Sequence, residues 1–187
     1  MQWTIPGTAL PTTTEEIGQL EERFKGMFLG GGMMLSQVAA ITGLEPYTIQ
    51  NWVKRGFLTK PTAKKYTLRQ LCRIININML KDALPMEEIC GLLSCVNGHL
   101  DDEGDDLIDD SQLYFLFIRL AAQHRQMNTP AGRDASLAQV LSDYEEPVPG
   151  ARERVEKVLR VMLTAWAAAA LRQQAVSMTN ALKNDNI

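Results

Sequence analysis

The chain has 187 residues, of which 45% are hydrophobic and 22% are charged, and this composition excludes a disordered or fibrous protein. Its net charge of −3 argues, taken alone, against a nucleic-acid partner. The first residues, MQWTIPGTAL, lack the basic and apolar regions of a signal peptide, and the longest apolar stretch, 161–171, is too short to span a membrane. We therefore expect a cytoplasmic protein with no membrane partner.

The charge is strongly segregated along the chain. Residues 36–82 carry eight basic and two acidic side chains, whereas residues 83–146 carry three basic and thirteen acidic ones. Residues 1–35 are weakly acidic and residues 147–187 weakly basic. A block of +6 within an acidic chain is the pattern expected where one segment binds a polyanion.

The N-terminal region predicts one helix followed by a glycine break. Thr13 and Glu16 have the spacing of a capping box, and apolar residues follow at helical spacing, so we expect a helix over about 14–28. Gly30 to Gly32 end it. No Lys-Ser or Lys-Thr pair follows these glycines, which favours a hinge over a phosphate-binding loop.

Two short helices are expected next. Ser36 is the expected cap of the first, which Gly43 ends in a left-handed turn. Pro46 is the expected first residue of the second, which runs to Arg55 and ends at Gly56. Two short helices joined near a glycine, the second opening with proline, are the pattern of a helix-turn-helix.

Two more helices and an acidic connector follow. Thr67 and Gln70 form another capping box before a helix that reaches Leu80, and Pro85 begins a helix that continues through Leu93. The segment NGHLDDEGDDLIDDS, which starts at residue 97, is expected to be a solvated connector. A calcium loop is disfavoured, because the positions that need glycine and glutamate hold aspartate and glutamine.

The C-terminal region predicts helices over about 110–127 and 137–144 and a long helix over about 151–183, with the stretch MNTPAGRDAS as a loop between the first two. The long helix carries an apolar stripe that needs a partner, which is the 110–127 helix, another subunit, or both. The stripe comprises Val155, Leu159, Met162, Trp166, Ala169 and Val176. No segment alternates clearly with period two, so we expect a mainly all-α fold with a minor sheet at most.

The cysteines and histidines do not predict a metal, a cofactor or an active site. Cys72, Cys90 and Cys95 are an odd number without a CxxC pair, so we expect small buried side chains rather than disulfides. The spacing of Cys90, Cys95 and His99 fits no tetrahedral metal site. His99 and His124 lie far from any plausible nucleophile, so we do not expect an enzyme.

The second helix of the motif has the two faces that a DNA-reading helix needs. Ile49, Trp52 and Val53 form the side that docks on the preceding helix. The other side offers amide groups that can pair with adenine and cations that can meet phosphate. The candidates there are Tyr47, Thr48, Gln50, Asn51, Lys54 and Arg55. The alternative, an ordinary amphipathic surface helix that binds nothing, remains open on this pattern alone.

A short basic loop, LTKPTAKKYT, follows this helix directly. In a winged arrangement such a loop lies along the sugar-phosphate backbone of the duplex. The expected phosphate contacts are Lys60, Lys64, Lys65 and Arg69. The acidic segment 83–146 would keep the duplex away from the rest of the protein by repulsion.

Three stretches, LSQVAAITGLEPYTIQNWVKRGFL, KKYTLRQLCRI and DALPMEEICGLL, together resemble the MerR-type winged helix. The resemblance covers about a third of the chain and implies a dimer that distorts promoter DNA in response to a signal at C-terminal helices. Gln50 and Asn51 replace an arginine and a tyrosine that are typical of the family, and the wing lacks its usual Gly-Tyr-Arg. The resemblance therefore supports the fold more strongly than the family's grip on phosphate.

A second resemblance covers roughly residues 25–120. NWVKRGF, KKY, INML and NGHLDDEGDD are similar to a family known only as domain of unknown function 1836. Together the patterns predict an N-terminal helix and hinge over 1–34, a MerR-like winged helix-turn-helix over 35–97, and an acidic connector with a helical dimerisation or effector region over 98–187.

The expected function is that of a dimeric, DNA-binding transcription regulator whose partner is double-stranded DNA. An unidentified small-molecule or protein effector is expected at the C-terminal helices. Two alternatives remain open, namely a protein-interaction module that uses the basic segment on an acidic partner, and a non-specific architectural or excisionase-like DNA binder.

Overall fold

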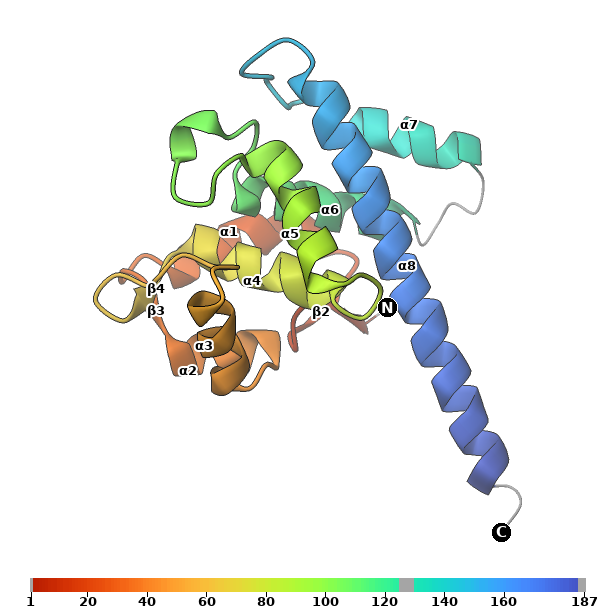
Figure 1. Cartoon of the computed structure of the whole chain (residues 1–187). Coiled ribbons are helices and arrows are strands. Elements are labelled where there is room, and N and C mark those ends of the chain that lie inside the picture. The colour runs from red at the N-terminus through yellow and green to blue at the C-terminus, as the bar shows by residue number, and fades with distance from the viewer. Residues whose placement is uncertain (1, 125–129, 185–187) are drawn as a thin grey trace.

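The computed structural model describes residues 2–124 and 130–184 and is mainly helical, which confirms the expected mainly all-α class (Figure 1). Two small antiparallel sheets pair β1 (Gln2–Thr4) with β2 (Pro11–Thr13) and β3 (Met33–Met34) with β4 (Lys65–Tyr66). The helices are α1 (Leu20–Met27), α2 (Leu35–Thr42), α3 (Pro46–Lys54), α4 (Leu68–Leu80), α5 (Met86–Asn97), α6 (Asp110–His124), α7 (Pro130–Val140) and α8 (Ala151–Asn184), with short 3-10 helices at Ile17–Gln19 and Glu103–Asp105.

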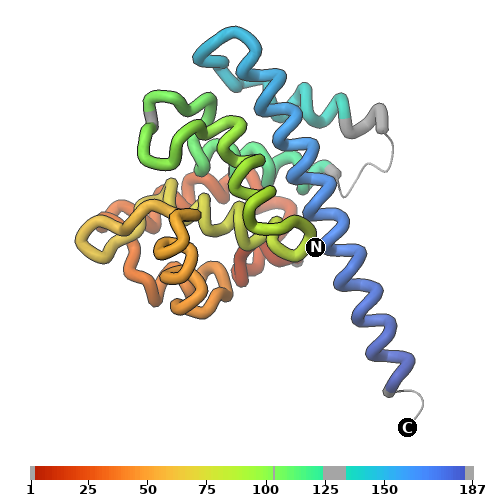
Figure 2. The backbone as a smooth tube through the Cα atoms, viewed as in Figure 1, coloured from red at the N-terminus to blue at the C-terminus, as the bar shows by residue number. Residues whose placement is uncertain are grey.

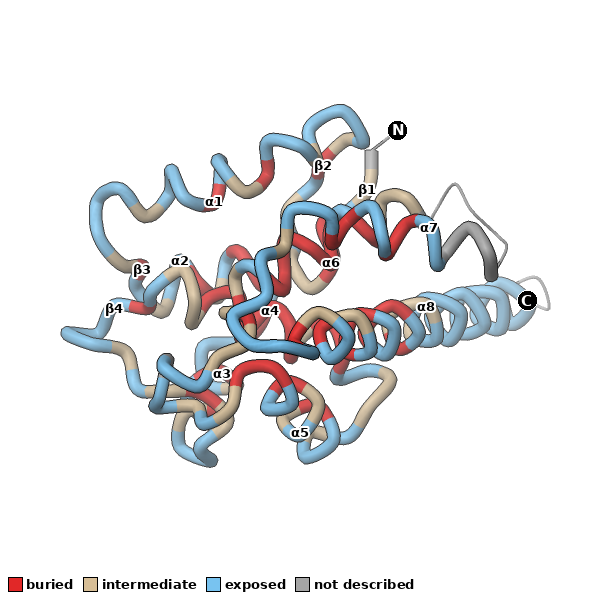
Figure 3. Tube along the Cα trace, turned by 90° about the horizontal axis from the view of Figure 1, so that it is seen from above, coloured by how far each residue is buried: buried red, intermediate tan, exposed pale blue. Residues whose placement is uncertain are grey.

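Helix α4 is the centre of the fold. Its Leu71, Ile74, Ile75 and Ile77 are fully buried, and α2, α5, α6 and α8 all pack against it. In Figure 3 most of α4 is coloured as buried residues, and other elements surround it. The sequence explains this position, because apolar residues occupy most sides of α4, and such a helix is stable only inside a core.

The N-terminal segment closes over this core. Tyr114 of α6 is completely buried and donates a hydrogen bond to the Pro6 carbonyl oxygen at 2.9 Å. Gly7 has a φ of +74°, and a Cβ atom there would lie 2.5 Å from the carbonyl oxygen of Ile75. Glycine is therefore required at this position both for the backbone conformation and for the close approach to α4.

The first predicted helix is shorter than expected. The Glu16 carboxylate accepts a hydrogen bond from the Thr13 amide at 3.1 Å, as the capping box predicts. The residues that follow first form a turn and a 3-10 helix, and the α-helix begins only at Leu20. The predicted break at the glycines is present, since α1 ends at Met27.

The glycine segment is more than a hinge. A Cβ atom at Gly32 would lie 2.7 Å from the carbonyl oxygen of Tyr66, so the missing side chain lets β3 approach β4. The predicted cap at Ser36 is wrong, because α2 already begins at Leu35. Gln37 caps this helix instead, and its side-chain oxygen accepts a hydrogen bond from the Met34 amide at 2.8 Å.

The C-terminal helices agree with the sequence except around α7. Helix α6 is described to His124, and the remaining residues of the predicted 110–127 helix lie outside the described residues. The predicted loop was wrong from residue 130 onward, because α7 spans Pro130–Val140. The predicted helix over 137–144 correspondingly ends at Val140.

Helix α8 has two different halves (Figures 1 and 3). Val155, Leu159 and Met162 are buried, and Trp166 packs edge-on against Phe117 of α6, with ring centroids 6.0 Å apart. Beyond this point the helix projects from the body, and the described residues from 170 onward are exposed. The predicted stripe thus finds its partner within the chain for its first half only.

No helix in the described part of the chain combines the length and apolar character required to cross a membrane.

Candidate nucleic-acid interface

Helices α2 and α3 are joined by a three-residue turn that their own side chains hold. Gly43 has a φ of 69°, which confirms the predicted left-handed turn. The Thr42 hydroxyl donates to the Val38 carbonyl at 2.8 Å and accepts from the Leu44 amide at 3.3 Å. These bonds satisfy polar groups at the end of α2 and fix the direction in which α3 leaves the turn.

Helix α3 presents the polar face that its sequence predicts. Pro46 is its first residue, and Ile49 and Trp52 are buried against the core. On the other side Tyr47 is 73% exposed. Gln50 and Lys54 are also exposed, and Thr48 and Asn51 are half-buried. Because these positions are three or four residues apart, their side chains lie along one face of the helix.

The loop after α3 folds as a tight turn that is supported by a strand. The Lys65 amide donates to the Thr62 carbonyl at 2.9 Å, and Ala63 and Lys64 have positive φ values of 49° and 62°. Non-glycine residues seldom adopt this conformation, which costs of order 1–3 kcal/mol each. We call residues 58–66 the wing; its last two residues form β4, which pairs with β3.

Gln70 attaches the wing to the start of α4. Its side-chain oxygen accepts from the Thr67 amide at 2.9 Å, and the Thr67 hydroxyl accepts from the Gln70 amide at 3.2 Å, which confirms the predicted capping box. The Gln70 side-chain nitrogen also donates to the Thr59 hydroxyl at 2.8 Å and to the Lys60 carbonyl at 3.2 Å. One side chain therefore holds the wing in place.

Four exposed lysines lie at this surface. Lys54, Lys60, Lys64 and Lys65 are exposed, and none of them contacts a carboxylate among the residues that the structure describes. A bound polyanion could therefore contact these ammonium groups without first displacing an internal partner.

Arg55 forms weaker contacts than Arg69 and Arg73, which are described below. Its Nη2 lies 3.4 Å from the Glu87 carboxylate, and its guanidinium stacks 4.6 Å from the ring centroid of Phe57. Both members of the ion pair are more than half exposed, so the pair contributes little to stability. Arg55 thus remains accessible to a ligand.

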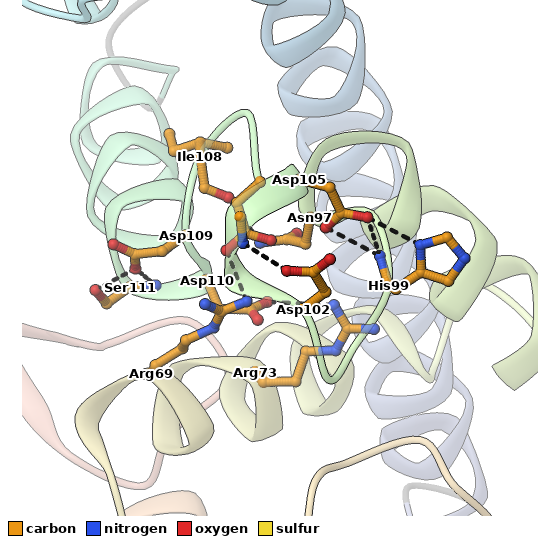
Figure 4. Close-up of polar contacts among 12 residues, drawn as sticks. Arg69, Arg73, Asn97, His99, Asp102, Asp105, Ile108, Asp109, Asp110 and Ser111 are labelled. Atoms are coloured by element: carbon orange, nitrogen blue, oxygen red, sulfur yellow. Dashed lines mark hydrogen bonds and ion pairs between the residues drawn. The ribbon is translucent and has the colours of Figure 1, made fainter. Parts of the chain in front are cut away.

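Arg69, the fourth predicted phosphate contact, is occupied by the acidic connector. Its Nη2 lies 2.7 Å from Asp106 Oδ2, in an ion pair that is mostly shielded from solvent. One turn further along α4, Arg73 Nη1 lies 3.5 Å from Asp110 Oδ1, and both side chains are almost fully buried (Figure 4). Burial raises the pKa of Asp110, although Arg73 and Arg69 oppose this effect.

The connector therefore folds back onto α4 instead of remaining fully solvated. Asn97 donates to the Ile108 carbonyl at 2.7 Å and closes the loop (Figure 4). The Asp105 carboxylate accepts from both the amide and the ring nitrogen of His99 at 2.9 Å. This hydrogen bond raises the pKa of the exposed His99 ring. The His99 ring and the Asp105 carboxylate thus stabilise the outer part of the connector.

A cavity of about 270 Å³ separates the wing from the connector. Lys60 and Thr62 of the wing and Gln70 of α4 line one side, and Leu100 and Asp101 of the connector line the other. The Arg73 Nε group is buried and has no hydrogen-bond partner among the described residues. The wing thus lies beside the acidic connector, but its lysines are not neutralised by it.

The cysteines follow the sequence prediction only in part. All three thiols are free. Cys72 is buried in α4, and burial raises its pKa well above the usual value. Cys90 is half-buried, and Cys95 is exposed, contrary to the expectation of a buried side chain, because it lies on the outer side of α5. Within the described ranges, no group of three or more His, Cys, Asp or Glu side chains could hold a metal ion.

The sequence patterns do not predict the two buried ion pairs of α4. Arg69 and Arg73 are four residues apart and therefore share one face of α4, a signal that the sequence contains. Both count toward the basic charge of residues 36–82, yet in the structure both are paired with acids of the connector. Within residues 36–82 the exposed basic side chains consequently lie at the end of α3 and in the wing, apart from Lys81 at the end of α4.

Part of the chain is similar to a known protein family. Residues 33–117 match the family described as "Domain of unknown function (DUF1836)". This match confirms the predicted resemblance to that family from β3 to α5, over the connector and over the first half of α6.

A curated relative is the "Uncharacterized protein YkrK" of Bacillus subtilis (strain 168), which is 25% identical over 128 residues. The aligned region is 66% of this chain and 54% of the relative, so the chain spans about half the length of that protein. No solved structure matches. Neither the description of the family nor that of the relative names an activity.

Proposed function

We propose that the chain is a dimeric, DNA-binding transcription regulator that uses a MerR-like winged helix-turn-helix. The observation that carries this proposal is the exposed polar face of α3 beside a wing whose lysines form no ion pair with the residues that the structure describes. In Figures 1 and 3 the two elements lie at the same end of the molecule. Figure 2 shows that this end is built from a continuous stretch of chain, from α2 to β4.

The proposed contacts follow from the chemistry of each side chain. Gln50 and Asn51 carry amides that can offer a paired donor and acceptor to adenine in the major groove. Lys54 and Arg55 at the end of α3 face the neighbouring phosphates, and the wing lysines extend the phosphate contacts along the backbone. Arg69 contributes only after release from Asp106.

The acidic connector supports this orientation of the duplex. Asp106 and Asp110 are used inside the protein, but Asp101 and Asp102 remain exposed next to the wing. Their charges repel a duplex that drifts away from α3 and toward the connector.

The projecting half of α8 supports the dimer. From Val161 in the packed half into the projecting half, exposed small or apolar residues recur at alternating spacings of three and four, which is the heptad pattern of a coiled coil. This α8 stripe comprises Val161, Thr164, Ala168, Leu171, Ala175, Met178 and Leu182. A second copy of the chain is the proposed partner, because two reading helices are needed to occupy two half-sites on one face of a duplex.

The salt dependence of DNA binding tests the proposal. We expect the full chain to bind a random duplex, with an affinity that falls as salt rises. The double variant Lys64→Ala, Lys65→Ala should weaken binding to every sequence and make the slope of log K against log salt shallower by about two units, since each phosphate contact contributes about 0.9. Fluorescence anisotropy at a series of salt concentrations measures both.

A matched control removes two charges from a distant surface. Arg154→Ala, Lys157→Ala on α8 changes the net charge equally but leaves the wing intact, and its slope should equal that of the wild type. An unchanged slope in the wing variant would remove the wing from the interface. A wild type that binds no duplex would refute the function and favour an acidic protein as the partner of the lysines.

A further inference from the structure

Leu29 is an exposed leucine that neither the core nor the proposed contacts of α3 and the wing explain. It lies in residues 28–32, which join α1 to β3 and which we call the glycine loop. Leu29 is 90% exposed, more than any other large hydrophobic residue in the described part of the chain. The next values, 73% for Tyr47 and 67% for Leu171, belong to the α3 face and to the α8 stripe. Single exposed leucines are common on protein surfaces, so the surroundings of Leu29 decide whether its exposure has a function.

The glycine loop is folded as a turn on the end of α1. The Leu29 amide donates to the Gly26 carbonyl at 3.3 Å, and the Gly31 amide donates to the Phe28 carbonyl at 2.9 Å. Phe28 is half-buried and packs against the core. Because its two neighbours in the chain are fixed in this way, Leu29 projects into solvent from an ordered backbone.

The glycine loop lies directly beside the wing. A Cβ atom at Gly31 would lie 3.6 Å from Lys65 Nζ, so the ammonium group of Lys65 is next to the loop. Strand β3 follows the loop and pairs with β4, the end of the wing. In Figures 1 and 3 the β3–β4 pair lies between the end of α1 and α3. The wing therefore has α3 on one side and the glycine loop on the other.

This order corresponds to the order of features on a DNA duplex. The major groove is bordered by a sugar-phosphate backbone, and the minor groove lies beyond that backbone. With α3 in the major groove and the wing lysines on the backbone, the glycine loop comes next to the minor groove. Leucine is one of the apolar side chains that proteins insert between base pairs from this groove, which kinks the duplex.

The glycine loop carries no charge that would repel phosphate. Residues 26–34 contain neither acidic nor basic side chains. Gly30 is exposed, and its amide donates to no other residue that the structure describes. A backbone amide of this kind can donate to a phosphate oxygen. The loop thus combines an apolar side chain with a donor for the backbone of the duplex.

We propose that Leu29 enters the minor groove beside the wing and inserts between two base pairs as an apolar wedge. Lys65 contacts the backbone between the wing and the loop, and the Gly30 amide donates to a phosphate beside the inserted leucine. The duplex bends at this point, most readily at TA and CA/TG steps, which unstack easily. This inference rests on the proposed DNA-binding function and adds a contact outside the winged helix-turn-helix.

The test compares Leu29→Ala with the wild type on the duplex that the wild type selects from a random library. Dyes at the two ends of the duplex report its bend by energy transfer, and fluorescence anisotropy reports the affinity. Leu29→Ala should reduce the bend and weaken binding about ten-fold, which corresponds to leaving one leucine side chain in water. The slope of log K against log salt should equal that of the wild type, because an apolar contact releases no counterions.

Two variants provide the controls. Val148→Ala shortens another exposed aliphatic side chain, in the segment between α7 and α8, and should change neither affinity nor bend. Leu29→Met keeps an apolar side chain that can form the same wedge and should retain both properties. Because Leu29 is outside the core, Leu29→Ala should unfold in urea at the same midpoint as the wild type.

The outcomes separate the wedge from the proposed function. The wedge is refuted, and the function stands, if the wild type binds the duplex and Lys64→Ala, Lys65→Ala lowers the salt slope while Leu29→Ala keeps the wild-type affinity and bend. Weaker binding by Leu29→Ala with an unchanged bend would refute insertion between base pairs, and an equal loss in Val148→Ala would refute a specific contact. A wild type that binds no duplex would refute both proposals.

Discussion

The pKa of the Asp106 carboxyl is subject to opposing influences. Burial raises the pKa of its carboxyl to about 6, and the nearby charges of Asp110 in α6 and Asp105 in the connector act in the same direction. Arg69 of α4 opposes them. The folded protein therefore binds a proton at Asp106 more tightly than the unfolded chain, whose aspartates titrate near 3.9.

The stability of the fold should depend on pH through this residue. A carboxyl whose pKa is raised on folding stabilises the folded state as pH falls through that pKa, so the contribution grows from pH 7 to pH 4.5. Asp106→Asn removes this titration, and Asp110 titrates in both proteins. We expect the unfolding free energy of the wild type, relative to Asp106→Asn, to increase between pH 7.5 and pH 5. Urea denaturation at both pH values measures it, and an identical difference at both would contradict the assignment.

At the residue scale, the sequence does not distinguish buried acidic residues from exposed ones. DDEGDDLIDD reads as one solvated run, yet Asp110 is buried whereas Asp101 and Asp102 are exposed. The difference arises where the connector folds back onto Arg69 and Arg73, and this is a contact between distant parts of the chain. The composition of the connector alone does not show which of its acids make this contact, so the fold-back could not have been predicted from it.

At the element scale the sequence predicts the helices of residues 35–97 well. Pro46 and Gly43 fix the start of α3 and the turn before it, and Ile49 and Trp52 fix which side is buried. Strands β3 and β4 were not predicted. Each has two residues, too few for a period-two pattern, and their pairing depends on Gly32 lying against Tyr66.

The orientation of α3 can be tested at Asn51. If its amide reads adenine, Asn51→Ala should reduce the discrimination at the contacted base pair by about 1–3 kcal/mol and leave the salt dependence unchanged. Selection from a random duplex library, followed by competition between the preferred site and single-base variants, measures the change.

Gln173→Ala provides the control for this variant, because Gln173 is an exposed amide on the projecting half of α8. Its base preference should match that of the wild type. If a folded Asn51→Ala protein retains the full base preference, α3 does not present Asn51 to the bases and a different face of α3 lies in the groove.

At the scale of the whole molecule, one core joins segments that the sequence separates. The buried cluster runs from Ile5 to Ala165 and includes residues of the N-terminal segment, of residues 35–97 and of the C-terminal helices. The predicted boundaries at residues 34 and 97 therefore divide the chain without dividing the core. A change at the C-terminal helices can reach α4 directly, because α6 and α8 both pack against it.

The projecting half of α8 is where the whole molecule should meet its second copy. Leu171 and Met178 are 67% and 62% exposed and lie one heptad apart in the α8 stripe. The double variant Leu171→Asp, Met178→Asp should place repelling charges in the coiled-coil seam and convert the dimer to a monomer. Its affinity for a specific duplex should fall at least ten-fold, because a monomer fills one half-site only. Gln173→Asp, Asn180→Asp adds the same charge and the same helix-disfavouring residue on the opposite face of α8 and should remain dimeric. Sedimentation velocity measures the mass of each protein, and a wild type that sediments as a monomer at micromolar concentration would refute the α8 dimer.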